Sequence, residues 1–142
     1  MYEQLQTQHN VVPAPALILD KAQLASLNGA LRLAARNAPE IASRLLEEID
    51  RAEVLSTKDV PETVVTLGSW VTYQDVENGS IRTLQLVLPN VADRAQQKFS
   101  IISPIGAALI GLSVGQVMPW TVRDGEQRRL TVLRVSKLPV SV

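Results

Sequence analysis

The spacing of apolar residues changes across the segment 56–62, and this change constrains the fold more than any other feature. Before it, apolar residues recur every three or four positions, as on one face of an amphipathic helix. After it, apolar and polar residues alternate, as in half-buried strands. Pro61 ends the helical pattern and marks the boundary. The sequence therefore predicts an α+β protein with helices first and a sheet second.

The helical half predicts an antiparallel hairpin of two helices. Asp20 is a candidate N-cap, with Gln23 three residues later as in a capping box. The pattern breaks just before Pro39, which suits the first turn of a second helix, and it resumes as far as Leu55. The predicted organisation is a flexible tail over residues 1–16, a short coiled-coil hairpin over 17–56, a linker over 57–62 and a second domain over 63–142.

Five strands are expected in the second half, forming a mostly antiparallel sheet. They cover residues 64–73, 81–88, 98–102, 117–122 and 128–135. Asn78-Gly79 is a strong hairpin signal between the first two strands, and Asp124-Gly125 indicates a hairpin between the last two. Gly68 predicts a bulge in the first strand, and the alternation in the last strand is imperfect.

One short capped helix is expected between the third and fourth strands. Ser103 is placed to accept a hydrogen bond from a free N–H of the first turn, and Pro104 suits the first helical position. Gly111 suits the left-handed conformation that closes a helix. The buried side of this helix would consist of Ile105, Ala108, Leu109 and Ile110. These residues explain why the segment folds, and they predict a scaffold that covers the sheet.

Balanced charge and a lack of reactive side chains exclude several classes of function. The chain has 14 basic and 14 acidic residues, which argues against nucleic-acid binding by bulk electrostatics. It has no cysteine, and its single histidine, His9, lies in the expected tail, so we predict no catalytic residue, no metal site and no cofactor. Glu47, Glu48, Asp50 and Glu53 are interpreted as a solvated helix face rather than a cation site.

The composition also bears on location. No run approaches the roughly 18 apolar residues of a membrane span, so we expect no membrane association. Residues 1–16 lack the basic start and the hydrophobic stretch of a secretion signal. Together with the absence of cysteine, this favours a cytoplasmic protein.

The stretch Ile102–Gly111, followed by Ser113–Gly115, resembles the C-terminal domain of the GreA/GreB transcript-cleavage factors. Val64–Thr72 resembles the first strand of that domain, and Ala52–Leu55 resembles the end of the family's coiled coil. The likeness covers about residues 45–137 and implies an FKBP-like fold for the second half. The motif residues interpreted as mainly structural are Ser103, Pro104, Ala108, Leu109, Gly111 and Gly115.

Within this superfamily, the likeness is greatest to the regulators of nucleoside diphosphate kinase (Rnk). The helical hairpin is far shorter than that of a Gre factor, and Glu48–Ala52 resembles the second helix of this branch. Helices of about 15 residues reach about 25 Å at 1.5 Å per residue. The link to nucleoside diphosphate kinase comes from the family name, and we expect it to be indirect.

The expected tip, Asn37-Ala38-Pro39-Glu40, carries one carboxylate. Gre coiled coils end in an acidic pair that helps to hold magnesium in the polymerase active site, where the metal activates water. The resemblance therefore implies a non-enzymatic regulator that binds RNA polymerase near the secondary-channel rim and competes with Gre-type factors without stimulating cleavage. The candidate partner-binding residues are Asn37, Ala38, Pro39, Glu40, Arg123, Arg128 and Arg129.

Other interpretations stay open. The three candidate arginines also fit a solvated edge strand, and the tip also fits a plain helix connection. The FKBP-like likeness suggests a peptidyl-prolyl isomerase as the alternative, although such enzymes line their pocket with many aromatics. The second half has four aromatics, of which Trp70, Phe99 and Trp120 are interpreted as core residues. A hairpin that pairs with another helix is a third reading. DNA binding is associated with transcription factors of this kind, but no direct sequence-specific contact with nucleic acid is expected.

Overall fold

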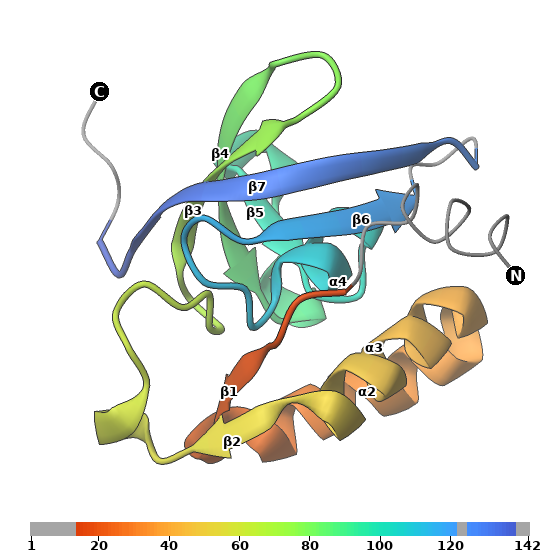
Figure 1. Ribbon diagram of the computed structural model, residues 1–142. Helices are drawn as coiled ribbons and strands as arrows, with labels where there is room; N and C mark the ends of the chain where they lie inside the picture. Colours follow the sequence, from red (N-terminus) through yellow and green to blue (C-terminus); the bar gives the residue numbers. More distant parts are fainter. Residues whose placement is uncertain (1–13, 122–124, 139–142) are drawn as a thin grey trace, which may run out of the picture.

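Two antiparallel helices form the first half of the protein, within the residues 14–121 and 125–138 that the computed structural model describes (Figure 1). They are α2 (Leu24–Asn37) and α3 (Pro39–Arg51), separated by Ala38 alone. The buried positions on them are Leu27, Ala30, Ala34, Ala42, Leu45 and Glu48. Their spacing of three and four residues confirms the predicted amphipathic pattern, and Pro39 begins the second helix as expected. Neither helix, nor any other in the described residues, is long and apolar enough to cross a membrane.

The start of the helix pair differs from the predicted capping box. Asp20 caps a 3-10 turn, η1 (Lys21–Gln23), by accepting a hydrogen bond from the Ala22 N–H at 2.9 Å. The Gln23 side chain does not return to Asp20. Instead it donates to the Leu67 carbonyl at 3.2 Å and accepts from the Leu67 N–H at 3.0 Å. The predicted capping box was wrong because the Gln23 side-chain amide pairs with both backbone groups of Leu67 and not with the start of its own helix.

A small parallel sheet joins the two ends of the helix pair. It consists of β1 (Ile18–Asp20) and β2 (Glu53–Leu55), with Ile18 opposite Glu53. The prediction that helix continues to Leu55 was therefore wrong, because α3 ends at Arg51. The Ile18 N–H also donates to the Gly111 carbonyl at 3.0 Å, which attaches this sheet to the second half.

The second half is a curled five-stranded sheet with α4 (Pro104–Leu109) packed on it (Figure 1). Its strands are β3 (Trp70–Asp75), β4 (Ile81–Val87), β5 (Lys98–Ser100), β6 (Val117–Thr121) and β7 (Gln127–Ser136). They lie in the order β5-β4-β3-β7-β6, and only the β4–β5 pair is parallel. Three 3-10 turns complete the described elements: η2 (Thr57–Asp59), η3 (Pro89–Val91) and η4 (Arg94–Gln96). The α+β class and the mostly antiparallel sheet are confirmed.

The bulge lies on a different strand from the one predicted. Gly68, at φ 92°, belongs to a turn before β3. The bulge is on β7, because Thr72 pairs with Arg134 while Tyr73 pairs with Val132. Leu133 is therefore the extra residue, and its side chain is exposed. This insertion explains the imperfect alternation in the last strand.

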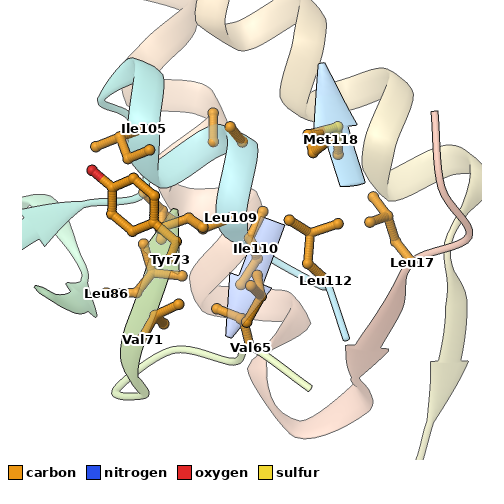
Figure 2. Packing of buried hydrophobic residues seen from close by; sticks show 14 of the residues in the cluster. Leu17, Val65, Val71, Tyr73, Leu86, Ile105, Leu109, Ile110, Leu112 and Met118 are labelled. Carbon is orange, nitrogen blue, oxygen red and sulfur yellow. The ribbon is translucent and has the colours of Figure 1, made fainter. Parts of the chain in front are cut away.

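One hydrophobic core runs from the helix pair into the sheet, and Figure 2 shows the part of it around α4. Leu27 and Leu45 from the helices belong to the same buried cluster as Leu109 of α4. Phe99 and Trp120 are half-buried and pack against this cluster, as expected for core aromatics. Trp70 is half-buried but does not belong to it. The helix pair is consequently packed against the second half rather than extended away from it.

Candidate functional site

The first turn of α4 carries the cap that the sequence predicts. The Ser103 hydroxyl accepts a hydrogen bond from the Gly106 N–H at 3.1 Å and donates to the Ser100 carbonyl at 2.6 Å. Pro104 occupies the first helical position and is exposed. Ser103 is thus held from two sides, and Pro104 is presented on the surface.

The remaining motif residues form scaffold. Ala108 and Leu109 have no exposed surface. Gly111 has φ 84°, and a Cβ added there would lie 3.1 Å from the Cβ of Leu17, so both conformation and space favour glycine. Gly115 has φ 91° with open space around it, so only its conformation matters. These placements agree with the structural interpretation of the motif.

Gly106 is a motif residue that the sequence analysis did not single out. A Cβ at this position would lie 2.0 Å from the Ser100 carbonyl oxygen. The helix therefore approaches the end of β5 more closely than any side chain permits. The only signal in the sequence is a glycine inside a helix, where glycine costs about 1 kcal/mol relative to alanine and needs a packing reason.

A groove of about 640 Å³ lies between α4, α3, the end of β6 and Gly125. It is lined by Glu40, Ile41, Arg44, Pro104, Ala107, Thr121 and Gly125. Glu40 and Pro104 were predicted from separate halves of the chain, and here they line the same groove. No aromatic residue contributes to this described lining, so the groove gives no support to a prolyl isomerase.

The helix connection exposes the other predicted tip residues. Asn37, Pro39 and Glu40 are exposed, and Ala38 is half-buried. The Ala38 N–H donates to the Ala34 carbonyl at 2.7 Å, which closes the first helix. Glu40 is the one carboxylate among the four tip residues. The tip is a compact turn that presents little charge.

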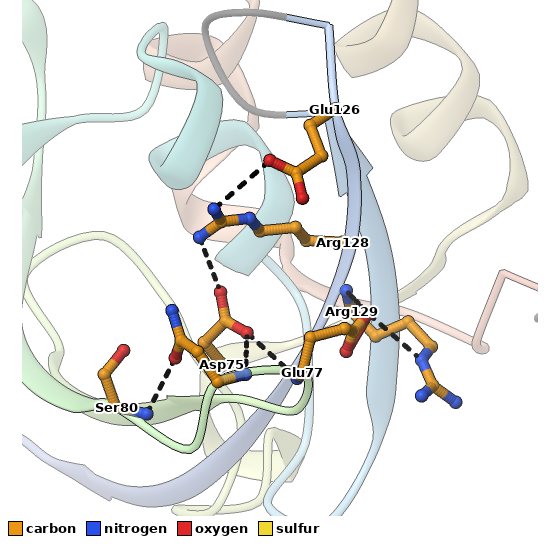
Figure 3. A network of polar contacts seen from close by, with 7 residues as sticks. Asp75, Glu77, Ser80, Glu126, Arg128 and Arg129 are labelled. Atoms are coloured by element: carbon orange, nitrogen blue, oxygen red, sulfur yellow. Dashed lines mark hydrogen bonds and ion pairs between the residues drawn. The ribbon is translucent and has the colours of Figure 1, made fainter.

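Arg128 lies inside an ion-pair network rather than on an open edge (Figure 3). β7 pairs with β3 on one side and β6 on the other, so the edge-strand interpretation was wrong. Arg128 donates from Nη1 to Asp75 Oδ2 at 3.1 Å and from Nη2 to Glu126 Oε2 at 3.3 Å. Both terminal nitrogens of the guanidinium are engaged, and the bond to Asp75 holds β7 against the β3–β4 hairpin.

The Asp75 carboxylate organises the β3–β4 turn from its buried end. Its Oδ1 accepts from the Glu77 N–H at 3.0 Å and from the Asn78 N–H at 3.1 Å. Burial alone would raise the pKa of Asp75, but the hydrogen bonds from Asn78, Arg128 and Glu77 together hold this pKa below its usual range. Gly79 follows at φ 77°, which confirms the predicted hairpin turn.

Arg129 makes a more exposed contact on the other side of the strand. Its N–H donates to Glu77 Oε1 at 2.9 Å, and its Nε donates to the same atom at 3.3 Å. Both side chains are more than two-fifths exposed. Arg123, the third candidate arginine, lies outside the described residues. Of the two arginines that the structure describes, neither Arg128 nor Arg129 lines the groove that contains Glu40.

Glu48 contradicts the prediction of a solvated acidic face. Glu47, Asp50 and Glu53 are exposed, but Glu48 retains only 4% of its surface. Burial raises the pKa of Glu48 to about 7, although the neighbouring Arg44 opposes this increase. Helical spacing indicates that Glu48 is buried, because it lies three residues after the buried Leu45 on the same face of α3.

Arg44 is paired with Glu48 on α3 and connects the helix pair to the sheet. Its Nε donates to Glu48 Oε1 at 2.9 Å, and its Nη2 donates to the Pro119 carbonyl on β6 at 2.6 Å. The second carboxylate oxygen, Oε2, has no partner among the described residues, and neither has the buried Trp120 Nε1. The contact between α3 and β6 therefore depends on one oxygen of the buried Glu48 carboxylate, whose other oxygen has no described partner.

Comparison with known proteins places this geometry in a family. Residues 60–137 match the family model for the C-terminal domain of the transcription elongation factors GreA/GreB. The regulator of nucleoside diphosphate kinase of Escherichia coli strain K12 is 35% identical over 99 residues, covering 70% of this chain and 73% of that protein. The transcription elongation factor GreA of Thermosipho melanesiensis is 38% identical over 81 residues, covering 55% of this chain and 51% of that protein.

A solved structure extends the likeness to the helix pair. The prokaryotic transcription elongation factor GreA/GreB from Nitrosomonas europaea superposes with a TM-score of 0.68 at 30% identity, covering 84% of this chain and 98% of that chain. The family model covers more than half of the sequence, and it includes the capped helix and all five strands of the larger sheet. The chain therefore belongs to the GreA/GreB C-terminal domain family.

Proposed function

We propose that this protein binds RNA polymerase near its secondary channel and competes there with Gre-type factors without stimulating transcript cleavage. Family membership supports the choice of partner, since relatives are named transcription elongation factors. The likeness to a regulator of nucleoside diphosphate kinase supports placing the protein in the branch of the superfamily that has a short helical hairpin. Any effect on that kinase would then be indirect, through transcription. With RNA polymerase as its partner, the protein would act in the cytoplasm.

The tip of the helix pair is the observation that carries this proposal. α2 has 14 residues and α3 has 13, so each helix is about 20 Å long at 1.5 Å per residue. The tip offers the single carboxylate of Glu40. A catalytic metal that activates water is commonly held by more than one carboxylate, so this tip is poorly suited to the role.

The docking surface in this proposal combines the tip with the exposed start of α4. Glu40 and Pro104 line one groove of about 640 Å³, so a single partner surface reaches both. Asn37, Ala38 and Pro39 extend this surface beyond the groove. Arg129 is a peripheral candidate, because it is exposed but already paired with Glu77. Arg123 and Arg128 stay secondary candidates.

Binding and competition are tested together on purified components. The protein is expected to be retained by core RNA polymerase and to be displaced by a Gre factor. Added to backtracked polymerase with a Gre factor, it is expected to lower cleavage in proportion to its concentration. Cleavage stimulated by the protein alone would overturn the proposal, and so would a failure to bind core polymerase.

A pair of variants locates the docking surface. Pro104→Glu places a charge on an exposed groove residue and is expected to weaken polymerase binding about tenfold. Lys58→Glu, on the exposed turn η2, is the matched control and should bind normally. Equal binding by both variants would exclude the groove as the docking surface. A proline-peptide isomerisation assay on the unaltered protein distinguishes the alternative enzyme activity.

A further inference from the structure

One edge of the large sheet is left open along half of β4. β5 pairs only with the end of β4, from Gln85 to Val87. The remaining residues, 81–84, have a strand neighbour on the β3 side alone. In Figure 1 the β3–β4 hairpin extends past the other strands, so this length of β4 borders no strand on its outer side. An open strand edge presents a row of unpaired backbone groups.

The direction of these backbone groups follows from their neighbours. The Gln85 N–H donates outward to the Gln97 carbonyl at 2.8 Å, whereas the Leu86 N–H donates inward to the Ser69 carbonyl at 2.9 Å. Backbone groups alternate in direction along a strand, so Ile81 and Thr83 point theirs outward with Gln85. No described residue makes a backbone hydrogen bond to Ile81 or Thr83 on this side.

A groove of about 370 Å³ runs beside this edge and carries positive charge. It is lined by Tyr73, Ile81, Arg82, Thr83, Leu84, Arg94, Gln97 and Phe99. Neither Arg82 nor Arg94 has an ion-pair partner among the described residues, and no acidic residue contributes to this lining. The Arg94 guanidinium lies 5.3 Å from the centre of the Phe99 ring, which holds one of the two charges beside the groove.

The opposite edge of the sheet shows what a closed edge looks like in this protein. β6 has Pro119 in the middle of the strand, where it offers no N–H. The Pro119 carbonyl, the group that faces away from β7, is already bound by Arg44 at 2.6 Å. Proline and an occupied carbonyl protect β6 against strand addition. β4 has neither protection over residues 81–84.

We propose that the open edge of β4 binds an extended acidic segment of a partner protein, which adds to the sheet as a further strand. The outward N–H and C=O groups of Ile81 and Thr83 supply the backbone hydrogen bonds. Arg82 and Arg94 pair with carboxylates of the segment. Because side chains on one face of a strand recur about every 6–7 Å, acidic residues at alternate positions fit best.

This site is separate from the proposed polymerase groove. The two grooves share no lining residue, so the proposal does not depend on the function proposed above. A nucleic acid would also meet the two arginines, but its phosphates would leave the backbone donors and acceptors of β4 only partly used. The row of unpaired N–H and C=O groups favours a peptide.

The probe is a fluorescent octapeptide that alternates glutamate with valine, and its control carries lysine in place of glutamate. The glutamate peptide is expected to bind, to weaken as salt is raised, and to exceed the lysine peptide about tenfold in affinity. On binding, the Ile81 and Thr83 amides should gain protection from hydrogen exchange in the intact protein. Equal affinity for both peptides, or protection confined to other strands, would overturn the proposal.

Two substitutions at Thr83 distinguish the loss of its backbone N–H from the effect of changing its side chain. Thr83→Pro removes the outward N–H and is expected to abolish binding, since proline is tolerated at an edge. Thr83→Val keeps this N–H and should bind within about twofold of the unaltered protein. Circular dichroism checks that both variants fold. Arg82→Glu provides a second reading if Thr83→Pro does not fold, with an expected loss of roughly threefold to fivefold. Full displacement of the peptide by oligothymidylate would instead assign the site to nucleic acid.

Discussion

Asp75 in the β3–β4 turn and Glu48 on α3 are two buried carboxylates in opposite settings. They retain 6% and 4% of their exposed surface, respectively. Asp75 accepts hydrogen bonds from two backbone N–H groups and from Arg128 (Figure 3), and its pKa is lowered. Glu48 receives Arg44 on one oxygen only, and its pKa is raised to about 7. At Asp75 the hydrogen bonds from several donors outweigh the effect of burial on the pKa, whereas at Glu48 the single arginine does not.

The two settings also differ in what they hold together. The partners of Asp75 lie in its own turn and on the neighbouring strand β7, so the network is confined to the sheet. Glu48 acts through Arg44, which reaches from α3 to Pro119 on β6. The hairpin turn is consequently stabilised by a satisfied charge, whereas the contact between helix pair and sheet includes a group that titrates near neutrality.

The largest expected effect comes from removing the satisfied carboxylate. Asp75→Ala leaves Arg128 and two turn N–H groups without their acceptor, and we expect it to lower the free energy of unfolding by about 3 kcal/mol. Urea denaturation at neutral pH measures this change. Ser80→Ala, in the same hairpin but exposed, serves as the control. A loss below about 1 kcal/mol would show that the network does not stabilise the turn.

A smaller effect on stability, which depends on pH, is expected from Glu48. Its carboxyl titrates near 4.5 in the unfolded chain and at about 7 in the folded protein, so the folded state binds more protons between these values. The free energy of unfolding should therefore fall as pH rises through this window, by about 1–3 kcal/mol. Glu48→Gln should abolish this part of the slope when both proteins are unfolded in urea at several pH values. An unchanged slope would assign the titration to another group.

The smallest effect is expected at the exposed end of the Asp75 network. Glu77→Ala removes the ion pair with Arg129, in which both side chains are exposed to solvent. We expect a change of at most about 1 kcal/mol, which added salt should reduce further. Thermal unfolding at low and high salt measures it. An effect as large as that of Asp75→Ala would mean that exposure does not distinguish these two carboxylates.

The elements that sequence analysis predicted correctly are those determined by neighbouring residues. Asn78-Gly79 forms the expected turn because only a few residues favour positive φ, and Gly79 adopts 77°. Ser103 and Pro104 begin α4 as expected because a cap depends on atoms two or three residues away. The packing motif of the family was predictable for the same reason.

The features that were missed depend on distant partners. The pairing of Ile18 with Glu53 joins residues far apart in the chain, and a three-residue strand carries no periodic signal. The bulge at Leu133 follows from register against β3, although imperfect alternation hinted at it. Glu48 was treated as solvated because acidic residues surround it, while its spacing from Leu45 indicated the buried face.

Prediction of the candidate site was limited in the same way. The tip and the capped helix were each predicted from local patterns, but nothing in the sequence indicated that Glu40 and Pro104 line one groove. Arg128 was interpreted from its charge alone, whereas its role depends on Asp75, 53 positions earlier in the chain. Residue types identified the candidates, and only tertiary packing showed that Arg128 and Arg129 are already paired.

The parallel pairing of β1 with β2 brings the two ends of the helix pair together at one base. The strand before the helices and the strand after them lie side by side, with Ile18 opposite Glu53 and hydrogen-bonded to Gly111. A loop whose ends are fixed together at its base can gain or lose whole helical turns at the far end without altering that base. Each turn added to or removed from both helices would move the tip by about 5.4 Å relative to α4, and would so reshape the groove that Glu40 and Pro104 line.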